Sequence, residues 1–201
     1  SVELKTETSG KILKIYLKDG AKVSKGALIA KLDDRELQAE KKRLEASLSL
    51  AKQSKERVAA LHEKGSATDV ELEKVNAELA IAEAAFDLNQ AQISKTEIRA
   101  PFSGVCGFFS VSTGQWVSTG TSIVTLSDVS TLKVRFALPQ RYAAGIKNGQ
   151  QVFLNDGERN LTGEGKIKAM DPVLSTSSRS RFVEAEIKNK SGKWLSGSFV
   201  A

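Results

Sequence analysis

The chain has 201 residues, of which 40% are hydrophobic, 27% charged and 6% aromatic, and it carries a net charge of +6. These proportions exclude a disordered polypeptide, and the scarcity of aromatic residues favours several thin modules over one large core. A single cysteine, Cys106, excludes an internal disulfide and a cysteine-built metal site, and no apolar run is long enough to predict a membrane-spanning helix.

Residues 8–33 are predicted to form a first unit of short β-strands, because apolar and polar residues alternate there. Turns are expected at residues 18–20 and 24–26, each of which ends in glycine. Asp33 and Asp34 follow, but adjacent residues of a strand point apart, so a catalytic carboxylate pair is not expected. Asp34 is better explained as the residue that opens the next helix, where a negative charge stabilises the helix N-terminus.

Residues 34–97 are predicted to form an antiparallel α-helical hairpin. The first arm, to about residue 63, contains no Gly or Pro, and apolar residues recur every seven positions at Leu37, Leu44, Ala51 and Val58. The chain turns at residues 64–67, and Thr68 with Glu71 forms a capping box that starts the second arm, which continues to about Lys95. The apolar residues of this arm form two heptad series, Leu72, Leu79, Phe86 and Ile93, and Val75, Ala82 and Asn89. The pattern predicts a two-helix coiled coil.

The hairpin has little apolar surface to bury by itself. Each arm spans about 30 residues, or roughly 45 Å, and the second arm is rich in alanine. We therefore expect neighbouring hairpins to pack side by side in an assembly, with a narrow freestanding coil as the alternative.

The charges are unevenly distributed along the chain. Residues 34–64 contain eight basic and six acidic residues, and residues 69–97 contain two and seven, which leaves the rest of the chain with a net charge of +9. The basic lysines are scattered and lack interleaved aromatic residues, which argues against a nucleic-acid surface. An anionic membrane surface, an acidic partner or simple solvation of the surface would each explain them.

Residues 100–128 repeat the first β unit. Gly10, Gly20 and Gly26 recur 94 positions later as Gly104, Gly114 and Gly120, and Val23, Ile29 and Leu32 recur as Val117, Ile123 and Leu126. The shared spacing predicts two copies of one small β unit, with these glycines as its structural turns. Neither copy can bury its apolar face alone, so residues 8–33 and 100–128 are predicted to close on each other as a two-part β-sandwich. The hairpin is then an insertion that leaves and returns at one point.

Residues 129–201 are predicted to form a small antiparallel β-barrel that is incomplete in this chain. A first strand is expected around residues 132–138 and a short helix at residues 139–146, followed by strands at Gln151–Asn155, Gly163–Ala169, Phe182–Ile187 and Phe199–Val200. The predicted fold class is thus α+β, mainly β: a split β-sandwich with an inserted coiled-coil hairpin, followed by the barrel.

No catalytic residue, cofactor site or metal site is predicted. His62 is the only histidine; it lies in the last turn of a helix far from Cys106, and is interpreted as a solvated helix-end residue. A zinc site lacks ligands, and one methionine, Met170, cannot build a soft-metal site. Phosphate-binding glycine motifs are absent, and Gly163 and Gly165 are interpreted as relieving crowding in a strand. We therefore expect no enzymatic activity.

The two glycine-marked units resemble the halves of a lipoyl or biotinyl domain. Such a domain carries its cofactor on a lysine in a tight turn between the halves, and here the coiled coil replaces that turn. A split lipoyl-like domain with an inserted helical hairpin and a following barrel is similar to the periplasmic adaptor (membrane fusion protein, HlyD-like) family of tripartite efflux pumps. Further similarity to this family is found at residues 99–105, 132–152, 170–179 and 195–200.

The resemblance implies an adaptor in the periplasm of a Gram-negative bacterium, associated with the inner membrane through segments that lie outside this chain. Such adaptors assemble as a ring, commonly a hexamer, and bridge an inner-membrane transporter to an outer-membrane channel of the TolC type. The arm length is typical of adaptors for proton-driven RND multidrug transporters. An ATP-driven transporter stays open as a partner, and the scarcity of Met and His disfavours metal efflux.

The resemblance also places the channel contact at the hairpin tip. Pump-type members carry Arg, then Leu four positions on, then Ser seven further, and this chain has Arg57, Leu61 and Thr68 at those positions. Threonine replaces serine, with its hydroxyl and capping role retained. A structural explanation exists as well, since Leu61 fits the coil seam and Thr68 the helix cap.

Two other classes of function stay open from the sequence. A lipoyl or biotinyl carrier serving an enzyme complex would show a covalent adduct in its mass, whereas an adaptor would not. A coiled-coil scaffold unrelated to transport would leave drug susceptibility unchanged when its gene is deleted.

Overall fold

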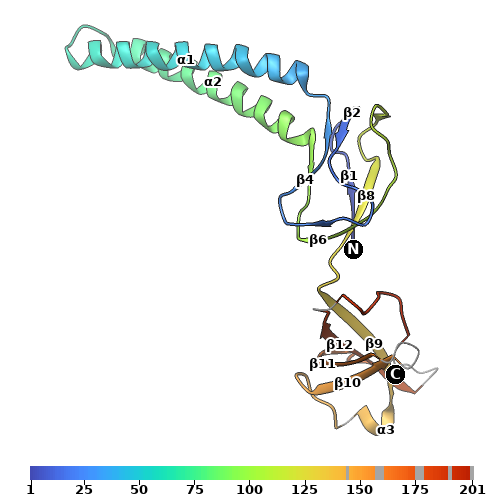
Figure 1. Ribbon diagram of the computed structural model, residues 1–201. Coiled ribbons are helices and arrows are strands. Elements are labelled where there is room, and N and C mark those ends of the chain that lie inside the picture. The colour runs from blue at the N-terminus through green and yellow to red at the C-terminus, as the bar shows by residue number, and fades with distance from the viewer. Residues whose placement is uncertain (144, 157–160, 175–178, 190–191, 200–201) are drawn as a thin grey trace. The chain divides into compact units, whose positions relative to one another are not determined.

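The computed structural model describes residues 1–201 except 144, 157–160, 175–178, 190–191 and 200–201. The chain divides into two compact units, Ser1–Leu126 and Ser127–Ala201. The first unit contains a β-sandwich and the helical hairpin, and the second contains one antiparallel sheet (Figure 1).

The sandwich is built from two four-stranded sheets that each contain strands of both repeated units. One sheet has the order β1 (Val2–Lys5), β8 (Ser122–Ser127), β6 (Gly104–Phe109), β3 (Lys22–Val23). The other has the order β5 (Glu97–Arg99), β4 (Leu28–Leu32), β2 (Gly10–Ile15), β7 (Trp116–Val117). The two units therefore close by exchanging strands, since β3 pairs with β6 and β2 with β7.

The core of the sandwich is formed by the residues that repeat at 94 positions. The repeated pair Ile29 and Ile123 is completely buried. The side chains of the repeated pair Leu32 and Leu126 are at most 1% exposed. Val117 and Val23 belong to the same hydrophobic cluster. Strand β1 was not expected from the sequence, because it is a four-residue segment outside the repeated units, and only Leu4 of its residues is buried.

The repeated glycines fall into two structural groups. Gly20 and Gly26, with their counterparts Gly114 and Gly120, have φ between +74° and +88°, a backbone conformation that residues with a side chain rarely adopt. Gly10 and Gly104 lie instead at the first positions of β2 and β6 rather than in turns. Their interpretation as turn residues is wrong for this reason: each begins a strand, and Gly10 is packed against Leu32.

The hairpin consists of α1 (Arg35–Glu63) and α2 (Asp69–Lys95), which lie side by side with their connecting turn at the end remote from the strands (Figure 1). Its seam buries Leu44 of α1 and the apolar residues Val75, Leu79 and Ile93 of α2. Asn89 is also buried in the seam, where its Nδ2 donates to the carbonyl of Leu37 at 3.3 Å. The Asn89 Oδ1 has no hydrogen-bond partner among the described residues.

An ion network joins the hairpin to the sandwich. The Lys31 ammonium of β4 lies 3.0 Å from the Asp34 carboxylate before α1 and 3.8 Å from the Glu97 carboxylate after α2. Asp34 also accepts a hydrogen bond of 2.7 Å from the Gln38 side chain. Burial alone would raise the pKa of Asp34, but hydrogen bonds from Gln38 and Lys31 outweigh it and lower that pKa. The hydrogen bond with Asp34 raises the pKa of Lys31.

The second unit is a four-stranded antiparallel sheet in the order β10 (Gln151–Asp156), β11 (Leu161–Met170), β12 (Ser180–Lys188), β9 (Thr131–Pro139). Among its described residues, the buried hydrophobic side chains are Leu154, Ile167, Val183, Ala185 and Ile187. No pairing between β9 and β10 is found in the described part of this unit, so closure into a barrel stays a prediction.

Several details of the second unit differ from the sequence-based expectation. Helix α3 (Gln140–Ala143) is shorter than predicted, and Pro139 ends β9 instead of starting the helix. Phe199 is outside any strand and 98% exposed, and Val200 lies outside the described residues. A two-residue apolar pair is too short to specify a strand. Gly163 does relieve crowding, because a Cβ there would lie 2.5 Å from Ile187 Cδ1.

Candidate functional site

The turn at the hairpin tip is stabilised by hydrogen bonds at the end of α1 and at the start of α2. At the end of α1, the amides of Gly65 and Ser66 donate to the carbonyls of His62 and Leu61, both at 2.8 Å. Gly65 has φ +68°, a conformation that a C-terminal helix cap requires. At the start of α2, Thr68 and Glu71 form the predicted capping box. The tip is therefore ordered by hydrogen bonds within the hairpin itself.

A side-chain contact also crosses the turn. His62 Nε2 lies 2.7 Å from Asp69 Oδ1, which joins the last turn of α1 to the first residue of α2. The interpretation of His62 as a solvated helix-end residue missed this contact. The available signal was positional: residues 62 and 69 flank the helix break, so an antiparallel hairpin brings them together.

A groove of about 350 Å³ lies between the two helices next to the tip. Its lining residues come from α1, the turn and α2, and comprise Ser54, Arg57, Val58, Leu61, Ser66, Ala67, Glu71, Lys74, Val75 and Glu78. Buried Val75 and half-buried Val58 provide an apolar base, and charged side chains surround it. The groove can accommodate an apolar side chain of a partner with polar groups around it.

The structure brings together two of the three residues assigned to the tip contact. Arg57 and Leu61 both line the groove, and Leu61 is 42% exposed instead of buried in the seam. Thr68 is exposed but is not a lining residue of the groove. Its hydroxyl accepts from the Glu71 amide at 3.2 Å and donates to Glu71 Oε2 at 2.9 Å, so it is fully used in the cap.

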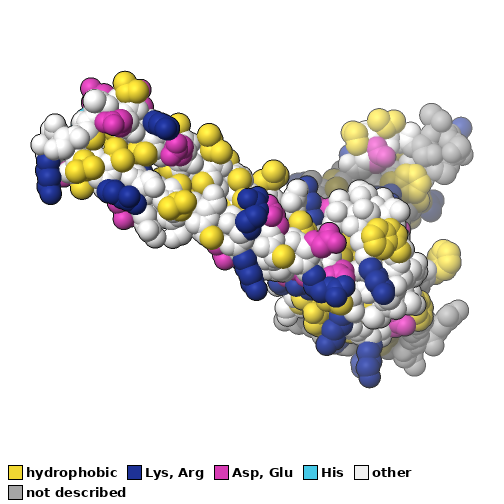
Figure 2. All heavy atoms as spheres, turned by 90° about the horizontal axis from the view of Figure 1, so that it is seen from above, with side chains coloured by type: hydrophobic (Ala, Val, Ile, Leu, Met, Phe, Trp, Pro, Cys, Tyr) yellow, Lys and Arg dark blue, Asp and Glu magenta, His cyan; other side chains and the backbone are white. Residues whose placement is uncertain are grey.

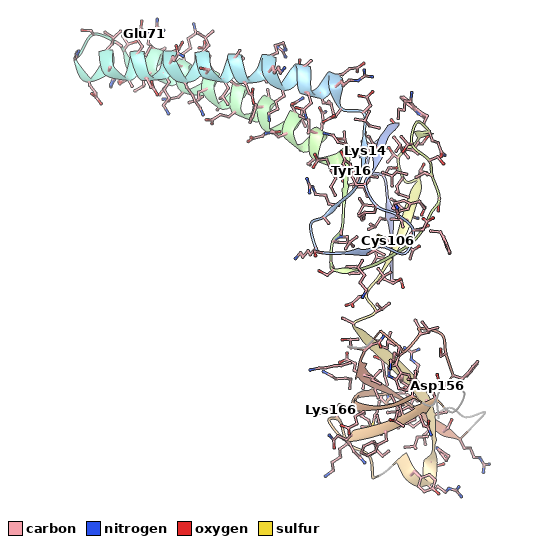
Figure 3. All side chains as sticks on the ribbon, in the orientation of Figure 1. Lys14, Tyr16, Glu71, Cys106, Asp156 and Lys166 are labelled. Atoms are coloured by element: carbon pink, nitrogen blue, oxygen red, sulfur yellow. The ribbon has the colours of Figure 1, made fainter. Side chains whose placement is uncertain are left out.

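Among the charged groups of the groove, Arg57 is the one left for a partner. Glu71, at the far end of the hairpin in Figure 3, accepts hydrogen bonds from the backbone and side chain of Thr68, which lower its pKa. Lys74 and Glu78 lie 4.0 Å apart on successive turns of α2. Arg57 is exposed and has no ion pair with any described residue. Its guanidinium can therefore donate to a carboxylate or to backbone carbonyls of another protein.

Sequence reasoning did not find the groove itself. Ser54, Lys74 and Glu78 carry no motif, and their convergence depends on how α1 and α2 are rotated about the seam. These residues could have been found by assigning heptad positions on both helices and including the positions next to the seam.

Chemistry-bearing groups elsewhere in the described residues do not form a comparable site. Cys106 lies within the sandwich (Figure 3), and burial raises the pKa of its thiol, which disfavours a reactive thiolate. Among the described residues, no three His, Cys, Asp or Glu side chains are placed so that they could hold a metal ion. Over the same residues, neither long helix is apolar enough to cross a membrane.

Comparison with protein families identifies the class to which this architecture belongs. Residues 1–127 match the family model described as RND MFP, barrel-sandwich hybrid domain. This region contains the strand-exchanged sandwich and the complete hairpin, and it makes up more than half of the chain. The chain belongs to the RND membrane fusion protein family.

Individual relatives agree with this membership. An uncharacterized protein of Haemophilus influenzae is 30% identical over 98% of this chain and 52% of its own length. The multidrug resistance protein MdtA of Xenorhabdus bovienii is 23% identical over 100% of this chain and 54% of its own length. The chain thus spans about half the length of these curated relatives.

A solved structure shows the same fold. The MacA–MexA chimeric protein that contains the Pseudomonas aeruginosa MexA α-hairpin domain superposes with a TM-score of 0.80 at 24% identity. The match covers 96% of this chain and 72% of the chimera.

Proposed function

We propose that this chain is the central part of a periplasmic adaptor that joins an inner-membrane transporter to an outer-membrane channel of the TolC type. The contact with the channel is made by the hairpin tip. The observation that carries the proposal is the ordered tip groove, which combines an apolar base with the unpaired guanidinium of Arg57. The multidrug resistance relative supports a role in efflux, and the family description supports an RND transporter as the partner, which the family resemblance implies to be proton-driven.

The division of the chain supports this role. In this proposal residues 8–33 with 100–128 serve as the lipoyl-like body, residues 34–97 as the projecting hairpin, and residues 129–201 as the β-barrel domain. In this proposal several copies assemble as a ring, a hexamer being the number that the family resemblance implies. The protein acts by connecting its partners and performs no reaction of its own.

The assignment of Arg57 is tested by reversing its charge. Arg57→Asp in the full-length protein is expected to lower cross-linking to the channel at least tenfold, because the guanidinium provides the charged hydrogen bonds of the contact. Thermal stability is expected to stay nearly unchanged, since Arg57 is exposed and unpaired. The measurements are channel capture after cross-linking in the native host, drug susceptibility and thermal unfolding.

A matched control is available on the same helix. Lys52 is also exposed and basic, but it is not a lining residue of the groove. Lys52→Asp makes the same change of charge and is expected to leave channel capture and drug susceptibility unchanged. Loss of stability in Arg57→Asp with intact pump activity would refute the contact, as would equal effects of both substitutions.

A further inference from the structure

One outer face of the sandwich combines exposed aromatic and apolar side chains with lysines. It is the outward side of the sheet β5-β4-β2-β7. Trp116 of β7 is 69% exposed, and Leu13 and Tyr16, in and directly after β2, are 48% and 45% exposed. Figure 2 shows Lys and Arg side chains over the sandwich end of the hairpin, with hydrophobic side chains between them. Large apolar side chains that gather on one face of a small module indicate an interaction surface.

A β-bulge in β2 brings its side chains to this face. The pairing of β2 with β4 passes over Leu13, which is an extra residue without a partner in the ladder. Along a regular strand Lys11 and Lys14 would point to opposite faces, because three residues separate them. The extra residue turns Lys14, and with it Tyr16, to the same outer face as Lys11, and all three are exposed. Bulges that redirect side chains in this way are frequent next to functional sites.

Trp116 reaches this face from the other repeated unit. It is the direct partner of Lys11 in the ladder between β2 and β7. The next residue, Val117, is 1% exposed and belongs to the core, so the indole of Trp116 lies on the outer face. The expectation that the lysines are scattered without aromatic residues among them is wrong here. The strand exchange places Trp116 beside a lysine about a hundred residues away in the sequence.

The two lysines of β2 are not neutralised by carboxylates. Neither Lys11 nor Lys14 belongs to a salt bridge among the described residues. The Lys14 ammonium lies 5.0 Å from the centre of the Tyr16 ring (Figure 3), a cation–π contact that positions the charge without removing it. Lys14 is also directly opposite Lys31 of β4, and like charges in such pairs destabilise a sheet. An anion bound at this face would relieve that repulsion.

The acidic residues near this face already have partners. Asp34 and Glu97 lie 3.0 Å and 3.8 Å from the Lys31 ammonium. Asp33 lies 2.6 Å from the Arg35 guanidinium. Because these carboxylates are occupied, the two ammonium groups of β2 are left for an external anion.

Rings and positive charges alternate across this face, in the order Trp116, Lys11, Lys14, Tyr16, over about 15 Å of β2. A glycan that carries carboxylates has the complementary order. The C–H groups on the face of a sugar ring stack on an aromatic ring, and its carboxylates accept charged hydrogen bonds from ammonium groups. A lipid surface is instead complementary to apolar side chains that insert together as one layer. The ammonium groups between the two rings interrupt such a layer.

We propose that this face, made of Lys11, Leu13, Lys14, Tyr16 and Trp116, binds an acidic glycan. A sugar ring stacks on the indole, carboxylates accept from the two lysines, and Tyr16 positions the Lys14 ammonium. The inference rests on the proposed function, because a periplasmic adaptor lies in the space that contains the cell-wall glycan, whose peptide stems carry carboxylates. The contact tethers the sandwich to the cell wall.

Co-sedimentation of the full-length protein with purified cell-wall sacculi tests the stacking contact. Trp116→Ala is expected to lower the bound fraction at least fivefold, because it removes the aromatic platform. The matched control is Phe108→Ala, since Phe108 of β6 is 85% exposed on the other sheet. It is expected to bind as the unchanged protein does. Both side chains are exposed, so equal thermal unfolding of the two variants is expected.

The charges are tested by reversal. Lys11→Glu combined with Lys14→Glu is expected to lower binding to sacculi at least tenfold and to remove its salt dependence. Lys22→Glu with Lys25→Glu makes the same change of charge at exposed residues elsewhere on the sandwich, and is expected to retain binding.

The role of Tyr16 is tested by two substitutions. Tyr16→Leu removes the ring beside Lys14 and is expected to weaken binding about threefold, whereas Tyr16→Phe keeps the ring and the affinity. Equal affinities of the two variants would overturn the positioning role of this ring.

The remaining outcomes overturn the proposal. Absence of binding to sacculi, or equal losses in the variants and their controls, shows that the face does not bind the glycan. Stronger binding to phosphatidylglycerol vesicles or to single-stranded DNA identifies another ligand. A smaller oligomer of Trp116→Ala in mass photometry identifies a second copy as the occupant. Arg57→Asp is expected to bind sacculi normally while it loses the channel, so a failure of this inference and a failure of the proposed function are distinguishable.

Discussion

At its base the hairpin is held by ion pairs with a lysine of the sandwich, whereas at its tip it is held by hydrogen bonds among the residues of the hairpin itself. Lys31 of β4 contacts Asp34 and Glu97 on the two sides of the insertion. The tip uses the amides of Gly65 and Ser66 and the capping box of Thr68. A tip that is ordered by hydrogen bonds within the hairpin leaves the exposed Arg57 free for a partner. The base, in contrast, uses its side chains to fix the hairpin.

The largest difference in the free energy of unfolding is expected between alanine variants of two leucines at opposite ends of the insertion. Leu32 ends β4 and is 1% exposed, whereas Leu61 is 42% exposed in the tip groove. Leu32→Ala is expected to lower the free energy of unfolding by about 3 kcal/mol, because it leaves a cavity in the sandwich. Leu61→Ala is expected to cost less than about 1 kcal/mol. Urea unfolding of both variants checks this, and equal losses would contradict the comparison.

The second prediction removes the charge network at the base. Asp34 is 5% exposed and accepts from both Lys31 and Gln38. Asp34→Ala is expected to cost about 2 kcal/mol, because it leaves a partly buried ammonium without its nearest partner. Glu36→Ala, an exposed change in the first turn of the same helix, is the control and is expected to cost less than about 0.5 kcal/mol. The measurement is again the free energy of unfolding.

The same network predicts the pH dependence of stability. The pKa of Asp34 is lowered in the folded state from its ordinary 3.8, so its contribution is present above pH 3.8 and is lost as the pH falls through the folded value. The pKa of Lys31 is raised from 10.5, so its contribution is present below that pH and is lost as the pH rises through the folded value. Asp34→Asn is expected to weaken the fall of the melting temperature at both the acid and the alkaline end, when thermal unfolding is measured from pH 2 to 12. An unchanged pH dependence of the melting temperature would contradict the assignment of this dependence to Asp34 and Lys31.

The helices could be predicted closely because their signals are local. Helix α1 begins at Arg35, one residue after the predicted start, and the capping box at Thr68 is confirmed. Heptad spacing and capping involve residues within seven positions of each other, so a single sequence contains all of the information. For the same reason, the pairing of two antiparallel arms followed from one short break at residues 64–67.

The strand exchange could not be predicted, because it is a choice between pairings that look equivalent in the sequence. The repeat at 94 positions marks the core residues, and Ile29 and Ile123 are indeed completely buried. It does not say which strands pair across the two units: β2 pairs both with β4 of its own unit and with β7 of the other unit, which lies about a hundred residues away. The groove depends likewise on helix rotation, which decided that Leu61 lines the groove instead of the seam.

The smallest expected effect concerns the cap at the tip. Thr68→Ala removes the hydroxyl that accepts from the Glu71 amide, and is expected to cost about 1 kcal/mol of local stability. Hydrogen exchange is expected to rise in the first turn of α2 and to stay unchanged around Lys31. Thr68→Ser keeps the oxygen and is the control. If Thr68→Ser supports normal exchange and normal channel capture while Thr68→Ala loses both, Thr68 acts by ordering the tip. Loss of capture with normal exchange would instead show that Thr68 contacts the channel itself.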